Sequence, residues 1–243
     1  TALLLTNKDQ KKAQNIVLFF LLIPYNFLIG TTMQVEQPLI MFSSIFIYYS
    51  IRFFKEKKPV YFYAIATFGA LAFLSKYTIV LFLAAVFLLI LFDREERKYL
   101  LNKHFWGAMI LFFVLIWPVL YWNWTHTFAS FKFHTDRIGE GYLGQYFLDF
   151  VFSQILYFSP IPFFYLIKNY KKLSWKNNTI ASKLFLIFLF VLGVFFFLSF
   201  KTHIYGHWTM IAAIPLALLM GLIFEEKLSR INIYMTVFLI ILI

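Results

Sequence analysis

The sequence predicts an all-α fold, a polytopic transmembrane helical domain that occupies residues 1–243 as a single unit. Three observations support this prediction. Hydrophobic residues make up 62% of the chain and charged residues only 14%, against about 25% charged residues in soluble globular domains. The mean hydropathy is high, at +0.77. The basic residues fall in short clusters between long apolar runs, as they do in the loops of helical membrane proteins.

A membrane-spanning helix needs about 20 mostly apolar residues to cross about 30 Å of hydrocarbon. This length predicts about eight spans, with a further incomplete helix from residue 231. The apolar run from Val60 to Phe92 is too long for one crossing, so we divide it into two helices that meet at Ser75-Lys76-Tyr77. The predicted spans cover residues 14–30, 38–54, 60–75, 77–92, 104–122, 145–167, 181–200 and 208–224. The start at Thr1 and the end inside an apolar run lead us to expect a fragment, truncated at both ends.

The basic residues separate onto alternate sides of these predicted spans. All but four of the 22 lysines and arginines fall on one side, and the four exceptions are Lys76, Lys132, Arg137 and Lys201. Short cytoplasmic loops are enriched in lysine and arginine, so the basic side is expected to face the cytoplasm. The sparsely charged side is then extracytoplasmic. Polar residues are few on this side, so each of them is a candidate for a structural or functional role.

Composition excludes several classes of function. The chain has no cysteine, so disulfides, thiolate metal sites and cysteine nucleophiles are ruled out. The net charge of +11 would suggest nucleic acid in a soluble protein, but in so apolar a chain it indicates membrane topology instead. No Gly-rich phosphate loop, Walker pattern or Ser/His/Asp spacing is present. Asn123-Trp124-Thr125 matches a glycosylation sequon but abuts a predicted span, so it carries little weight.

Two polar residues on the sparse side border predicted spans in the first third of the chain. Glu36 precedes Pro38, so its carboxylate either stabilises the N-terminus of the next helix or has a functional role. An ammonium between two apolar helices is costly, so Lys76 is expected to snorkel or to bind an anion, such as the phosphate of a lipid-borne substrate. Lys201, at the end of the 181–200 helix, has the same two interpretations.

Four of the five histidines also fall on the sparse side, at positions 126, 134, 203 and 207. His203 and His207 are four residues apart, and on a helix both imidazoles would share one face, as paired zinc ligands do. No HExxH pattern accompanies them and Gly206 weakens the helix, so interfacial hydrogen bonding is the alternative to a divalent metal. The loop from Asn123 to Gln145, which includes His126, could stack its aromatic rings on a sugar or lie on the lipid headgroups.

Five short motifs occur in a characteristic order: Val35-Glu36-Gln37-Pro38-Leu39, Gly69 to Tyr77, Pro118 to Phe131, Phe158-Ser159-Pro160 and His207-Trp208-Thr209. Together they resemble the bacterial relatives of the dolichyl-phosphate-mannose protein mannosyltransferases, a group that includes the lipid A aminoarabinose transferases. The resemblance covers nearly the whole chain. It implies a fold of the GT-C type in a multi-pass protein of the bacterial inner membrane, with its active site on the extracytoplasmic side.

The resemblance also implies an activity, in which a sugar moves from a polyprenyl-phosphate-linked donor to a protein, lipid or glycan acceptor. A carboxylate would act as general base, and cationic groups or a divalent metal would stabilise the departing lipid phosphate. The family's principal acidic motif would lie upstream of Thr1. Glu36 occupies an acidic position that is more often Asp, with a catalytic or sugar-positioning role. The residues expected to bind substrate are Lys76, Tyr77, His126, Lys201, His203 and His207, of which His203 and His207 are also the candidate metal ligands.

Two other functions remain as alternatives. A transporter or flippase for lipid-linked sugars would also have few outer charges, but it predicts charged or helix-breaking groups near the bilayer midplane. Charge within the predicted spans is scarce, which favours the transferase. A membrane O-acyltransferase is the third interpretation, and an essential His126 or His203 would favour it.

Overall fold

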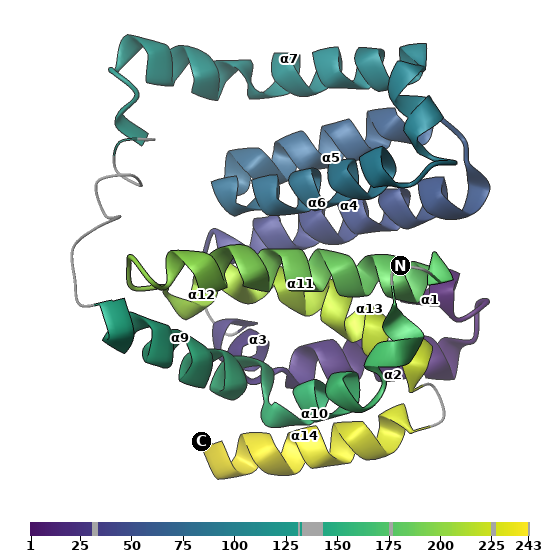
Figure 1. Cartoon of the computed structure of the whole chain (residues 1–243), viewed down its shortest axis with the longest axis vertical. Coiled ribbons are helices and arrows are strands. Elements are labelled where there is room, and N and C mark those ends of the chain that lie inside the picture. Colours follow the sequence, from purple (N-terminus) through teal and green to yellow (C-terminus); the bar gives the residue numbers. More distant parts are fainter. Residues whose placement is uncertain (31–33, 131, 133–142, 175–176, 225–226, 243) are drawn as a thin grey trace.

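The computed structural model shows a helical chain in which long helices lie side by side (Figure 1). It describes residues 1–30, 34–130, 132, 143–174, 177–224 and 227–242. Every regular element among these residues is a helix, as the composition predicts. The N-terminal elements are α1 (Ala2–Leu5), α2 (Gln10–Leu22), α3 (Pro24–Gly30), α4 (Glu36–Glu56), α5 (Tyr61–Ser75), η1 (Tyr77–Ile79), α6 (Val80–Phe92), η2 (Arg97–Leu101) and α7 (Lys103–Thr125). They are followed by α9 (Leu143–Phe158), α10 (Pro160–Lys168), η3 (Tyr170–Leu173), α11 (Ile180–Leu198), α12 (Gly206–Thr209), η5 (Met210–Ala212), α13 (Ala213–Ile223) and α14 (Leu228–Leu242).

Most predicted helices agree with the structure to within a few residues, including the division at Ser75-Lys76-Tyr77. Two predicted helices, 14–30 and 145–167, are wrong as single elements. The first is interrupted at Ile23, directly before Pro24, and the second at Ser159, directly before Pro160. Proline lacks an amide hydrogen and disfavours a helical residue before it, so each proline starts a new helix. The axes of α9 and α10 differ by 94°.

The expected eight spans are not confirmed. In the described part of the chain, three helical stretches are long and apolar enough to cross a membrane, and they are Lys103–Thr125, Ile180–Leu198 and Gly206–Ile223. The bent pair Tyr146–Phe158 and Pro160–Leu173 would be a fourth if it forms one span. The other apolar helices are shorter: α5, η1 with α6, and α14 each have fewer than 18 residues. Most predicted boundaries agree with the structure, but several of the helices are too short to count as complete spans.

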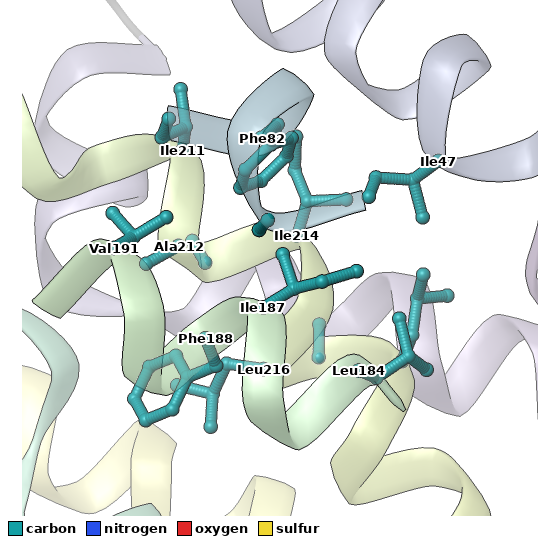
Figure 2. Close-up of a cluster of buried hydrophobic side chains, with 14 of the residues drawn as sticks. Ile47, Phe82, Leu184, Ile187, Phe188, Val191, Ile211, Ala212, Ile214 and Leu216 are labelled. Carbon is teal, nitrogen blue, oxygen red and sulfur yellow. The ribbon is translucent and has the colours of Figure 1, made fainter. Parts of the chain in front are cut away.

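The core lies around α11 and α13. The stretch Gly206–Ile223 is 72% buried, and Ala213–Ile223 is apolar on all its faces, as expected of an interior helix. Figure 2 shows side chains from α4, α6, α11 and the η5–α13 segment that meet in this core. The labelled residues are Ile47, Phe82, Leu184, Ile187, Phe188, Val191, Ile211, Ala212, Ile214 and Leu216. Small residues of the interior helix, such as Ala217 and Gly221, let its neighbours approach closely.

Helix α7 lies at one edge of the bundle and packs mainly on α5 (Figure 1). Only 11% of the residues in its most apolar stretch are buried. Its exposed side chains are large and apolar, and they include Trp106, Ile110, Phe113, Val114 and Trp117. An apolar face of this extent is a liability in water but suits contact with lipid chains. This face, together with the apolar helices, supports an integral membrane protein.

Buried ion pairs connect three helices at the basic end of the bundle. The Lys183 ammonium lies 3.2 Å from Asp93 Oδ2 and 3.1 Å from Glu96 Oε1, and Lys57 also pairs with Glu96. Glu96 is fully buried and Lys183 is 6% exposed. Because Lys57 follows α4, the two acids follow α6 and Lys183 belongs to α11, these contacts hold the three helices together. Part of the basic charge that we interpret as a topology signal is therefore also structural.

Asp93 is held in its charged form within this cluster. Its burial alone would raise the pKa, but the hydrogen bond and charge of Lys183 and the backbone amide of Glu95 outweigh that effect and lower the pKa of Asp93 below its ordinary value. The stability that this carboxylate contributes is present above the ordinary carboxyl pKa of about 4 and is lost as the pH falls through the lower folded value.

We predict that Lys183→Met lowers the free energy of unfolding by about 3 kcal/mol, because it leaves Asp93 without its ionic partner and the buried Glu96 with Lys57 alone. Lys98→Met is the matched control, since Lys98 is exposed and only 3.9 Å from exposed Glu95, and it should change stability by less than about 0.5 kcal/mol. Thermal unfolding of both variants in detergent measures the difference. Equal stability of the two variants would contradict a structural role for the ion pairs of Lys183.

A second prediction concerns Gly221. A Cβ added there would collide with the β-branched side chain of Ile16, which has little freedom to move. Gly221→Ala should therefore destabilise the protein by about 1–3 kcal/mol through overpacking. Gly193→Ala, within α11, meets nothing within 4 Å and should be neutral or stabilising by up to about 1 kcal/mol, because alanine favours a helix more than glycine does. Melting temperatures measured side by side should fall for the first variant and not for the second.

Candidate functional site

Glu36 and Lys76 form a buried ion pair at the end of the bundle opposite the Lys183 cluster. The Lys76 ammonium donates a hydrogen bond to Glu36 Oε1 over 2.6 Å. The Glu36 side chain is 5% exposed and the Lys76 side chain 19% exposed. The sequence predicts that Lys76 snorkels or binds an anion, and the structure supplies the anion from the protein itself.

Helix ends place both members of this pair. Glu36 is the first residue of α4, so its carboxylate also lies in the favourable field of that helix N-terminus. The hydrogen bond to a backbone amide at this helix start is made by the next residue: the Gln37 side chain accepts it from the Gln34 backbone amide. Lys76 ends α5 in an extended conformation, with φ −162° and ψ 137°, and this interrupts the helix so that the chain can turn into η1. The ammonium is thereby directed toward the start of α4.

Two further residues lie in the electrostatic environment of this pair, and a third contacts one of them. The charges of Glu36 and Lys76 both act on His207, and the charge of Glu36 also acts on the Tyr25 hydroxyl. The Tyr25 ring meets the Tyr157 ring edge to face, with centroids 4.7 Å apart. We refer to Tyr25, Glu36, Lys76, Tyr157 and His207 as the Glu36 cluster. It joins α3, α4, the end of α5, α9 and α12, which lie far apart in sequence.

Gly206 is required for this arrangement. A Cβ at position 206 would collide with the Tyr157 ring, so only glycine allows α12 to approach α9. Close by, the fully buried Thr209 hydroxyl donates a 2.7 Å hydrogen bond to Gln154 Oε1. In the sequence Gly206 is expected only to weaken a helix, whereas in the structure it allows close packing next to His207.

His203 and His207 do not share a helix face, so the condition for pairing them as metal ligands is not met. Helix α12 begins at Gly206, so His203 precedes it, outside any helix. His203 is exposed and contacts the rings of Tyr146 and Tyr205, and His207 stacks along Tyr205 with centroids 5.8 Å apart. Among the residues that the structure describes, no group of three His, Asp or Glu side chains could hold a metal ion. The geometry therefore gives no support to a metal at these two histidines.

Three other expected site residues lie outside the Glu36 cluster. Tyr77 follows Lys76 and packs its ring on Phe73, with centroids 4.8 Å apart. Lys201 is exposed, and its side chain makes no ion pair with another described residue. His126 ends α7 and stacks on Trp122, while its Nδ1 lies 2.8 Å from the Trp122 carbonyl oxygen and 2.9 Å from the Thr125 hydroxyl. None of the described contacts joins His126 to the Glu36 cluster.

The loop that carries His126 is partly outside the described residues, and His134 and Arg137 fall in that part. The sequon residue Asn123 is described and fully buried. Its amide donates to the Val119 carbonyl and accepts from the Ser130 backbone. A buried amide with both ends bonded cannot carry a glycan, which agrees with the low weight given to this sequon.

Sequence reasoning identifies Glu36, Lys76 and His207 but misses Tyr25 and Tyr157. Each is one of 15 tyrosines, and nothing in its local sequence distinguishes it from a ring that packs or anchors in the membrane. Only the approach of α3 and α9 to the start of α4 brings them together.

The arrangement suits the binding of an anion. An ammonium has three donor hydrogens, and one Lys76 hydrogen meets Glu36, so the group can also donate to the oxygens of a phosphate. The charge is partly exposed at the edge of an apolar bundle, where Coulomb attraction is stronger than in water.

Comparison with known families gives one match. The family model described as dolichyl-phosphate-mannose-protein mannosyltransferase matches residues 4–122, a segment that contains Glu36 and Lys76 but not His207. Comparisons with curated proteins and with solved structures give no match. The family implies a membrane glycosyltransferase of the GT-C type, in agreement with the resemblance of the motifs. Residues 4–122, just under half of this chain, are therefore similar to the dolichyl-phosphate-mannose-protein mannosyltransferase family.

Proposed function

We propose that this protein transfers a sugar from a polyprenyl-phosphate-linked donor to a hydroxyl of a protein, lipid or glycan acceptor, at the extracytoplasmic face of a bacterial inner membrane. The observation that carries the proposal is the buried Glu36–Lys76 pair, which lies within the matched segment and at the end of the bundle with few basic residues.

Lys76 would bind the donor phosphate. When the bond from the anomeric carbon to the phosphate oxygen breaks, the electron pair stays with the lipid phosphate, which gains negative charge. A fixed ammonium at that oxygen stabilises the charge as it develops and so lowers the barrier. Lys76 is suited to this role because its backbone ends a helix and its side chain is held by Glu36.

Glu36 would act as a positioning residue. Its 2.6 Å contact fixes the direction of the Lys76 ammonium, and its negative charge balances the positive charge of that ammonium in an apolar environment. The carboxylate is nearly fully buried and already paired, which makes it less suited to accept the acceptor's proton. The geometry thus favours the positioning role that the resemblance allows for Glu36 over the catalytic one.

The aromatic residues beside the pair would contact the sugar. Tyr205 and His207 present nearly parallel rings, with an angle of 18° between their planes, and His203 meets Tyr205 edge to face. Ring faces of this kind stack on pyranose rings, and imidazole nitrogens can donate to hydroxyl or phosphate oxygens. We keep Lys201 as a second, outer contact for the phosphate, because its exposed side chain is free to reorient.

We predict that Lys76→Ala in the full-length protein lowers kcat for transfer about 100-fold or more, because it removes the group that stabilises the departing phosphate. Lys201→Ala is the matched control, the same change at an exposed lysine of the same side, and should cost less than about 10-fold, mainly in KM. Membranes that contain each variant can be assayed with a radiolabelled polyprenyl-phosphate sugar. An effect of Lys201→Ala as large as that of Lys76→Ala would move the phosphate site to Lys201.

We further predict that Glu36→Gln reduces kcat about 10-fold, and that the Glu36→Gln, Lys76→Ala double variant is no worse than Lys76→Ala alone, because the two residues act as a unit. Glu36→Asp keeps the charge and should restore part of the activity. Additive losses in the double variant would show that Glu36 acts independently of Lys76, as a catalytic base would.

One observation favours a second candidate, a transporter for lipid-linked sugars. Helices α9 and α10 form a broken pair bent by 94°, and transporters place substrates at such breaks. The buried Ser159 at this break has φ 67° and ψ 147°, a conformation rarely adopted by residues other than glycine. Proteoliposomes distinguish the two functions, because a transporter moves the intact lipid-linked sugar between leaflets without an acceptor, whereas a transferase consumes it only when an acceptor is present. Nothing in the geometry favours the O-acyltransferase, since His126 lies outside the Glu36 cluster.

A further inference from the structure

A polar cavity lies at the basic end of the bundle, away from the Glu36 cluster. Its volume is about 360 Å³, and residues of α10, η3 and the end of α13, together with Phe224 and Lys227, form its walls. Its polar lining consists of Lys168, Asn169, Lys172 and Lys227. The chain after η3 is tied to the start of α11 by a 3.0 Å hydrogen bond from the Ser182 hydroxyl to the Ser174 carbonyl, which places the cavity at the same end as the Lys183 cluster.

The three lysines of this cavity differ from Lys57 and Lys183 at the same end. Lys57 and Lys183 are paired with buried acids, whereas Lys168, Lys172 and Lys227 form no ion pair with any residue that the structure describes. Glu225 and Glu226 precede Lys227 in the sequence and lie outside the described residues. Three ammonium groups around one cavity repel one another, so their convergence favours an anion between them.

The remaining walls of the cavity are apolar. Leu222, Ile223 and Phe224 line one side, and the Phe224 ring meets the Tyr165 ring with centroids 4.8 Å apart. The outer face of α10 is also apolar, because Phe164 is 63% exposed and Ile167 is 72% exposed just before Lys168. A molecule that fits this site combines an anionic group with apolar chains that leave along α10.

We infer that this cavity binds the headgroup of an anionic phospholipid, with its phosphate held by Lys168, Lys172 and Lys227 and its acyl chains lying against Phe164 and Ile167. Basic pockets between helices on the cytoplasmic side of membrane proteins bind such headgroups, and the positive-inside pattern places this end of the chain there. The site is separate from the donor phosphate site, because Lys76 lies at the opposite end of the bundle, and it does not depend on the proposed transferase activity.

The experiment uses the full-length protein in a zwitterionic detergent with added phosphatidylglycerol, cardiolipin or phosphatidylcholine, and native mass spectrometry counts the lipids retained. Retention of the two anionic lipids over phosphatidylcholine is expected. The Lys168→Gln, Lys172→Gln, Lys227→Gln variant should bind phosphatidylglycerol about 10-fold or more weakly. A matched variant, Lys8→Gln, Lys11→Gln, Lys103→Gln, removes the same charge from exposed positions at this end and should bind like the wild type.

Three results would overturn the inference: equal retention of all three lipids, equal weakening in both triple variants, or loss of bound lipid when inorganic phosphate replaces chloride at the same ionic strength. The first would show no headgroup preference, the second only a general effect of net charge, and the third a site for free phosphate. Because the substituted lysines are exposed, both variants should melt at the wild-type temperature, so a loss of lipid binding will not reflect unfolding.

Discussion

A charge that leaves water for an apolar helix bundle needs a partner, and this constraint shapes both ends of the structure. Few charged residues lie inside the bundle, and those that do occur as pairs or clusters. Glu36 pairs with Lys76 at one end, and Lys183 pairs with Asp93 and Glu96 at the other. Each set joins elements distant in sequence. Much of the relative placement of α4, α5, α6 and α11 follows from these contacts and from the core between them (Figures 1 and 2).

The two ion clusters use the same chemistry but have different access to ligands. Lys183 is 6% exposed, meets two acids, and lies 4.7 Å from the centre of the Phe54 ring, so its charge is neutralised within the protein. Lys76 meets one acid and its side chain is 19% exposed at the sparsely charged end. A single partner leaves donor capacity for a phosphate, whereas two partners satisfy the ammonium. This difference is why we assign function to Lys76 and a structural role to Lys183.

Helix interruptions contribute as much to the site as charges do. The break before Pro24 lets α3 bring Tyr25 near Glu36, the break at Lys76 directs its ammonium, and the break before Pro160 ends α9 just after Tyr157. A backbone that leaves helical geometry within an apolar environment exposes amide and carbonyl groups that must be bonded elsewhere, so such breaks are costly. Here they occur around the Glu36 cluster, where they give access to side chains that a regular helix would direct elsewhere.

The sequence by itself determined the helical class, most helix boundaries and the division at Lys76, and it pointed to Glu36, Lys76 and His207 as candidates, because apolar run length and isolated polar residues are local signals. It did not determine the breaks at Ile23 and Ser159 or the number of complete spans, since a proline may start, kink or end a helix according to its surroundings. Only the tertiary structure decided that Glu36 is the partner of Lys76, that His203 and His207 do not share a helix face, and that Tyr25 and Tyr157 adjoin the pair. These contacts depend on which helix ends meet in space. The local sequence around residues as far apart as Tyr25 and His207 does not indicate that they meet.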